Sequence, residues 1–173
     1  MKLYLTTLAL LFPFLSIAGA DNTLKVGDQA PNFSLQGSDG KVHTLSDYLG
    51  TTVVIAWFPK AFTGGWTVEC KSLRESDEAI SKYNAVLFMA SVDDIETNTA
   101  FAKKNNASFP VLSDAEKNVA LAYEVMSPLG FSKRWTYYIG TDGEILKIDK
   151  DITPLSAGED IANNLEALGF SPK

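Results

Sequence analysis

Hydrophobic residues along the chain alternate between nearly unbroken runs and helix-like spacing. The run over residues 52–58 predicts a buried strand, because both of its faces are apolar. It is followed by hydrophobic residues at helical spacing, which predict a helix over 67–83. Elsewhere the same two patterns predict strands at 33–36, 41–44, 85–91, 109–114, 134–139 and 144–148, a helical turn at 45–48, and helices at 97–105, 118–123 and 156–168.

Turn signals join some of these strands directly and leave others to be joined through helices. Asp39-Gly40 and Asp142-Gly143 are typical of tight hairpin turns between antiparallel strands. The central strands alternate with helices, which requires crossover connections and parallel pairing. The pattern therefore predicts an α/β fold with a mixed central sheet and helices on both faces.

The first twenty residues form a segment of a different kind. A positively charged start precedes an apolar run over 3–17, and the small residues 18–20 follow it, which is typical of a secretory signal peptide. A membrane helix is the alternative, but the run is short and contains Pro13. We therefore expect a signal peptide at 1–20 and one exported domain at 21–173, periplasmic or secreted and without membrane contact after cleavage.

Net charge and the few cysteine and histidine residues limit which partners and which kinds of site the chain can have. The chain carries 21 acidic and 15 basic side chains, a net charge of −6, which makes nucleic acid an improbable partner. Cys70 is the single cysteine, so the chain forms no internal disulfide. His43 has no other metal-binding residue at ligand spacing, and we expect a strand residue and no metal site. For the pair Asp93-Asp94 we expect a helix cap.

The junction between the strand at 52–58 and the next helix is the place where the pattern points to chemistry. Pro59 ends the strand because it lacks a backbone donor, and Gly64-Gly65 permits a tight turn and close backbone approach. A helix N-terminus then presents free N–H groups and a positive dipole end, which favour an anion such as a thiolate.

The same junction resembles a known family. Pro59-x-x-x-Thr63-x-x-Trp66 resembles the active-site signature of the peroxiredoxins of AhpC/TSA type, and Thr67-x-Glu69 with Arg74 resembles the bacterioferritin-comigratory-protein (Q-type) branch. The resemblance covers about residues 26–168. It implies a thioredoxin-like fold and thiol-dependent reduction of hydrogen peroxide or organic hydroperoxides. It also implies an external thioredoxin-like reductant, no cofactor, and a monomer or weak dimer.

The resemblance also implies roles for individual residues. Thr63 and Arg134 match the family's donors around the reacting oxygens, although Thr63 is equally a helix cap and Arg134 also fits an ordinary strand-edge charge. Trp66 stands where the family has its peroxidatic cysteine. Indole has no ionisable group in the relevant range, so we expect peroxidase activity to be impaired. The ring either fills the substrate space or opens the first helical turn. Since one base separates the Cys and Trp codons, Trp66 is either natural or a replaced cysteine.

Cys70 is the one thiol left to take over. It lies one helical turn after Trp66 and on the apolar stripe with Leu73 and Ile80. Two alternatives follow: an inert core residue, in a protein that keeps the fold for binding, or the nucleophile of an atypical one-cysteine peroxidase. An exposed thiol of lowered pKa would favour the enzyme, and a buried one beside a tryptophan-filled pocket would favour the binding protein.

Overall fold

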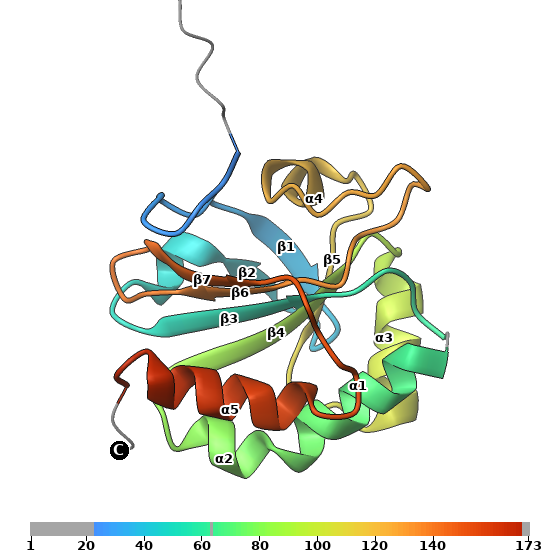
Figure 1. Cartoon of the computed structure of the whole chain (residues 1–173). Coiled ribbons are helices and arrows are strands. Elements are labelled where there is room, and N and C mark those ends of the chain that lie inside the picture. Colours follow the sequence, from blue (N-terminus) through green and yellow to red (C-terminus); the bar gives the residue numbers. More distant parts are fainter. Residues whose placement is uncertain (1–22, 63, 171–173) are drawn as a thin grey trace, which may run out of the picture.

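A computed structural model of the protein describes residues 23–62 and 64–170 (Figure 1). The predicted signal peptide and Thr63 lie outside the described residues. The strands are β1 (Ser34–Gly37), β2 (Val42–Thr44), β3 (Thr52–Trp57), β4 (Ala85–Ser91), β5 (Val111–Ser113), β6 (Thr136–Ile139) and β7 (Ile145–Asp149). The helices are η1 (Leu45–Tyr48), α1 (Gly64–Glu75), α2 (Asp77–Ser81), α3 (Ile95–Asn105), α4 (Asn118–Ala122) and α5 (Ala157–Ala167).

The strands form one sheet in the order β2-β1-β5-β4-β3-β6-β7. β3 pairs in parallel with β4, and β4 in parallel with β5, because helices connect them. The other pairings are antiparallel, including both predicted hairpins, β1–β2 and β6–β7. The mixed sheet is thus confirmed, and β3 lies inside it.

Helices cover both faces of the sheet and divide the interior into two cores. Val54 and Ala56 of β3 point into the core under α1, α2, α3 and α5, whereas Val53, Ile55 and Trp57 point into the core under η1 and α4. Figure 1 shows α1, α2 and α5 below the sheet and α4 above it. Because both faces of β3 are covered, its apolar run has no polar side, as the sequence pattern predicted.

The helix predicted over 67–83 is wrong at its start and in its middle. α1 already begins at Gly64, and it is interrupted at Ser76 before α2 begins at Asp77. The interruption lies where α5 packs closest: a Cβ on Gly158 would stand 2.3 Å from the backbone oxygen of Ser72 and 2.5 Å from Oγ of Ser76. Helical spacing within 67–83 does not reveal this contact with a distant segment.

The remaining predicted elements are confirmed to within two residues at each end. Asp94 caps α3, accepting a 2.7 Å hydrogen bond from the backbone N–H of Thr97. His43 lies in β2, as predicted. Its ring nitrogens contact the carboxylate of Asp39 at 3.1 Å and the hydroxyl of Tyr48 at 2.6 Å, which ties the first hairpin to η1.

The start of edge strand β7 is covered by the segment that precedes β1. The N–H of Gly27 donates to the carbonyl of Ile145 at 2.9 Å, and the N–H of Ile145 donates to the carbonyl of Asp28 at 2.9 Å. Gln29 forms an isolated antiparallel bridge with Glu144. This short segment, residues 27–29, therefore acts as an extra strand along the first part of β7.

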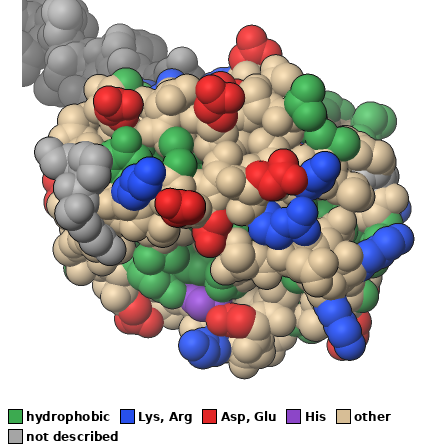
Figure 2. All heavy atoms as spheres, turned by 90° about the horizontal axis from the view of Figure 1, so that it is seen from below, with side chains coloured by type: hydrophobic (Ala, Val, Ile, Leu, Met, Phe, Trp, Pro, Cys, Tyr) green, Lys and Arg blue, Asp and Glu red, His purple; other side chains and the backbone are tan. Residues whose placement is uncertain are grey.

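Acidic and basic side chains are interspersed on the face of the molecule seen in Figure 2. The single histidine is visible there beside an acidic side chain and a hydrophobic patch. Within residues 23–62 and 64–170, the helices are all too short or too polar to span a bilayer.

Candidate functional site

The loop that leads from β3 into α1 is anchored by its neighbours in the fold. The backbone N–H of Phe58 donates to the carbonyl of Ala90 at 2.9 Å, and the carbonyl of Phe58 accepts from the hydroxyl of Ser132. The N–H of Ala61 donates to the carboxylate of Asp93 at 2.7 Å. The end of β4 and the segment before β6 thus fix the point from which α1 starts.

The left-handed residue in this loop is not one of the glycines. Phe62 has φ 61°, whereas neither Gly64 nor Gly65 has a positive φ, and both belong to α1. The prediction that the glycine pair forms the turn is therefore wrong. The predicted close approach does occur at Gly65, where a Cβ would stand 3.0 Å from Nη2 of Arg134. The missing side chain of Gly65 makes room for a guanidinium group.

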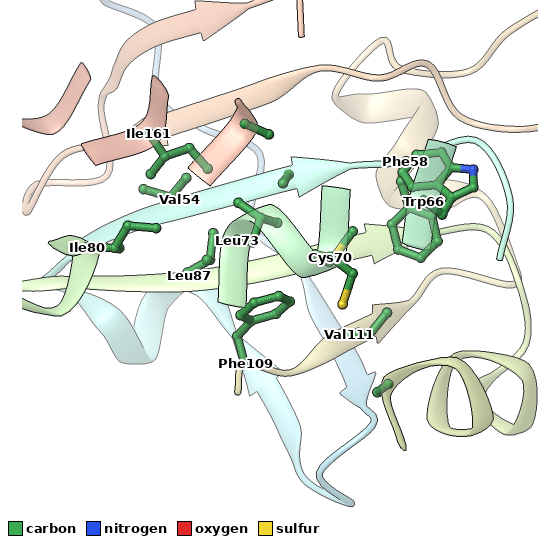
Figure 3. Close-up of a cluster of buried hydrophobic side chains, with 14 of the residues drawn as sticks. Val54, Phe58, Trp66, Cys70, Leu73, Ile80, Leu87, Phe109, Val111 and Ile161 are labelled. Carbon is green, nitrogen blue, oxygen red and sulfur yellow. The ribbon is translucent and has the colours of Figure 1, made fainter. Parts of the chain in front are cut away.

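The indole of Trp66 is packed between an aromatic ring and a cation. Its side chain is 1% exposed, and the centre of its ring lies 4.4 Å from the centre of the Phe58 ring. Figure 3 shows the two rings against each other. Cζ of Arg134 lies 4.2 Å from the centre of the indole, in a cation–π contact. Because α1 runs without interruption from Gly64 through Trp66, the ring has not opened the first helical turn.

Arg134 also forms an ion pair with Glu69, one helical turn after Trp66. Nη1 of Arg134 lies 2.8 Å from Oε2 of Glu69, and the two side chains are 21% and 1% exposed. The same nitrogen is 3.5 Å from the carbonyl of Gly65. Burial raises the pKa of Glu69 to about 7, against the lowering effect of Arg134. The carboxyl group therefore titrates close to neutral pH.

Cys70 is fully buried among hydrophobic side chains and does not belong to this charged group. Its exposed fraction is 0%, and Figure 3 shows it beside Leu73, Val111 and Phe109. Burial raises the pKa of the Cys70 thiol to about 11; the charge of Arg74 lowers it, and the charge of the neighbouring Glu69 raises it. Nη1 of Arg74 donates to the carbonyl of Asn105 at 2.8 Å, which ties α1 to α3. Of the two alternatives for Cys70, these properties are those of a core residue.

The structure thus brings together two of the predicted site residues, Trp66 and Arg134. It places Cys70 in the hydrophobic core. Glu69 appeared in the sequence analysis only as part of the Thr67-x-Glu69 motif, without a role in the site. That motif and its position three residues after Trp66, on the same side of a helix, were the available signals.

The described part of the chain shows no obvious ligand set for a metal ion. Within it, no group of three or more His, Cys, Asp or Glu side chains is gathered closely enough to hold one. The carboxylates near the site are engaged with the protein itself: Glu69 with Arg134, and Asp93 with the N–H of Ala61.

Comparisons with known proteins agree with this architecture. A sequence model of the AhpC/TSA family matches residues 26–148. Peroxiredoxin Bcp of Bacillus subtilis is 34% identical over 130 residues, which cover 75% of this chain and 81% of that protein. Among solved structures, peroxidoxin BcpB of Mycobacterium tuberculosis matches with a TM-score of 0.75 and 28% sequence identity. The match covers 83% of this chain and 97% of the BcpB chain.

A second solved structure, a cysteine-to-serine mutant of PrxQ from Xylella fastidiosa, matches with a TM-score of 0.79 and 24% sequence identity. The match covers 83% of this chain and 96% of the PrxQ chain. The two structural matches confirm the thioredoxin-like fold. The chain therefore belongs to the AhpC/TSA family of thiol peroxidases, on the branch of the bacterioferritin comigratory proteins and peroxiredoxin Q.

Proposed function

We propose that this chain is a peroxiredoxin-like protein whose peroxidase activity is lost or strongly impaired, because Trp66 stands at the position of the peroxidatic cysteine. The observation that carries the proposal is the buried indole of Trp66, held between Phe58 and Arg134. An ordered side chain of this size fills the space beside the arginine that the family resemblance assigns to the peroxide.

The chemistry of peroxide reduction explains why the absence of a cysteine at position 66 should abolish or impair activity. A thiolate attacks one oxygen of the O–O bond, a sulfur–oxygen bond forms, and the second oxygen leaves as water or an alcohol after taking up a proton. Cysteine becomes a sulfenic acid, which an external thiol must reduce. Indole supplies an N–H donor and no thiolate, so Trp66 cannot begin this sequence. The positive charge of Arg134 is meanwhile taken up by Glu69 and the indole ring.

Cys70 is a poor replacement for the missing nucleophile. With a thiol pKa of about 11, only about one molecule in ten thousand carries the thiolate at pH 7. The sulfur is also fully buried, so a peroxide has no access to it in the folded protein. These properties favour a non-enzymatic role, in which the fold is kept for binding, over a one-cysteine peroxidase.

The place of action is part of the same proposal. The sequence of residues 1–20 supports export, to a periplasm or to the outside, and a mature domain from Asp21 onward. If activity survives, the family implies a peroxide substrate and a thioredoxin-like reductant. The resemblance favours a monomer or weak dimer, and cleavage of the signal peptide leaves the domain without membrane contact.

Peroxide consumption by purified residues 21–173 tests the proposal, with thioredoxin as reductant. We expect no turnover from the natural chain or from Cys70→Ser, and turnover at least about a hundredfold above background from Trp66→Cys. Trp66→Ala is the matched control, because it removes the ring without supplying a thiol, and we expect it to stay inactive. Turnover by the natural chain that disappears in Cys70→Ser would instead establish Cys70 as the nucleophile.

A further inference from the structure

A buried carboxylate, a partly exposed guanidinium and a buried indole meet at the start of α1. Glu69 is 1% exposed, and its carboxylate has its ionic contact with Arg134, at 2.8 Å. The same guanidinium lies over the ring of Trp66 at 4.2 Å. Arg134 keeps 21% of its side chain exposed, so it has a path to solvent that the other two side chains lack.

The two contacts of Arg134 depend on the proton of Glu69 in different ways. An ionised carboxylate inside a protein needs a positive partner, because an uncompensated buried charge is costly. A protonated carboxyl group has no such need, and the guanidinium is then held mainly by its cation–π contact with the indole ring. The guanidinium packs against Gly65, where no side chain stands in its way, and the exposed part of Arg134 gives it a route to solvent.

Several other charged groups on α1 and on the helices beside it have partners of their own. On α1 itself, Lys71 pairs with Glu75 at 3.7 Å, and Arg74 donates to the carbonyl of Asn105. On the neighbouring helices, Lys104 of α3 lies over the ring of Phe62, and Asp160 of α5 accepts from the hydroxyl of Ser156. The other charged residues of these two helices are Glu96 and Lys103 on α3 and Glu159 and Glu166 on α5. Burial and Arg134 are the two influences found on Glu69.

We propose that Glu69, Arg134 and Trp66 form a proton-sensitive latch between α1 and the segment before β6. With Glu69 ionised, the guanidinium is held between carboxylate and indole and covers the ring. With Glu69 protonated, Arg134 exchanges between the ring and solvent, and one face of Trp66 becomes accessible. Because burial raises the pKa of Glu69 to about 7, both forms are populated close to neutral pH. The latch requires only these three side chains, so the proposal does not depend on whether the chain reduces peroxide.

Quenching of tryptophan fluorescence by acrylamide tests the latch across the range from pH 5.5 to pH 8.5. The contribution of Trp66 is obtained by subtracting Trp66→Phe, since Trp57 and Trp135 remain in both proteins. We expect quenching to increase as the pH falls through about 7. Glu69→Gln, which is neutral at every pH, is expected to lose this titration and to stay in the more quenched state. Glu75→Gln, an exposed acid on the same helix, is the matched control and should titrate like the natural chain.

Two results would overturn the latch: quenching that does not change with pH in the natural chain, or a titration that persists in Glu69→Gln. If Glu69→Gln does not fold, the Nε resonance of Arg134 in the unmodified chain supplies an independent measurement. We expect this resonance to shift with the same midpoint as the quenching, and a resonance that stays constant over the range would contradict the proposal. Neither measurement uses peroxide, so their failure is distinct from failure of the proposed function.

Discussion

Glu69 and Arg134 differ in how each tolerates the loss of the other. Without Glu69, the guanidinium of Arg134 can turn to water, because 21% of its side chain is already exposed. Without Arg134, the carboxylate of Glu69 stays inside the protein at 1% exposure with no ionic partner. At the scale of single residues, Arg134 is thus the side chain whose removal costs more.

Arg134→Ala is expected to lower the free energy of unfolding by about 3 kcal/mol at pH 8, because it leaves a buried carboxylate unpaired. The loss should shrink at pH 5, where Glu69 carries its proton and needs no partner. Urea unfolding of the natural chain and of Arg134→Ala at pH 5 and pH 8 measures the loss of stability at each pH. Lys71→Ala, which removes a side chain 63% exposed, is the control and should change stability little at either pH. An Arg134→Ala loss that is equal at pH 5 and pH 8 would contradict the role given to Glu69.

At the scale of elements, the closest helix–helix contact that shapes the site is between α1 and α5. The N–H of Gly158 donates to Oγ of Ser72 at 3.1 Å, which is possible only because the backbones approach without an intervening side chain. This contact lies beside Ser76, where α1 gives way to α2, and it holds against α5 the helix that carries Trp66 and Glu69.

Gly158→Ala should therefore destabilise the protein by about 1–3 kcal/mol, because the new Cβ would meet the backbone oxygen of Ser72 at 2.3 Å. Gly64→Ala is a matched substitution near the start of another helix, where no atom lies within 4 Å of the new Cβ. We expect it to be neutral or to stabilise by up to about 1 kcal/mol. Thermal unfolding of the two variants measures the difference. Equal stability would mean that α5 moves away from α1 at little cost.

The elements differ in how far the sequence could predict them. The apolar run of β3 was sufficient to predict a buried strand, because a strand covered on both faces is apolar along its whole length whichever elements cover it. The interruption at Ser76 was not predictable from local spacing, and the residue packed against it, Gly158, is distant in the sequence. In the site, the family resemblance brought Trp66 and Arg134 together. The role of Glu69 was missed because a single acidic residue on a helix is usually exposed, and only the fold shows that it is buried.

At the scale of the whole molecule, the buried carboxyl of Glu69 makes stability depend on pH in an unusual direction. The pKa of Glu69 in the folded protein, about 7, lies above its ordinary value of 4.5. Between these values the folded chain holds a proton that the unfolded chain has released. The stabilisation that the folded protein gains from holding this proton is fully present below about pH 4.5, and it is lost as the pH rises through 7. Burial raises the pKa of Asp114 as well, which acts in the same direction.

The natural chain is therefore expected to lose on the order of 3 kcal/mol of stability between pH 5 and pH 8. Glu69→Gln should remove most of this slope, whereas Glu75→Gln should keep all of it. Urea unfolding at intervals of half a pH unit gives the slope. A natural chain that is equally stable at pH 5 and pH 8 would show that Glu69 stays ionised throughout.

The segment at residues 27–29 has a consequence for how the molecule behaves in concentrated solution. It occupies the backbone groups of Ile145 at the border of the sheet, through two hydrogen bonds with Gly27 and Asp28. A bare sheet border is a template on which a second chain can add strands and begin aggregation. Cleavage by a protease just after Gln29 would leave the buried residues of both cores in place and still uncover this border. The colloidal stability of the protein thus depends on a tripeptide outside its core, and trimmed material should aggregate before it unfolds.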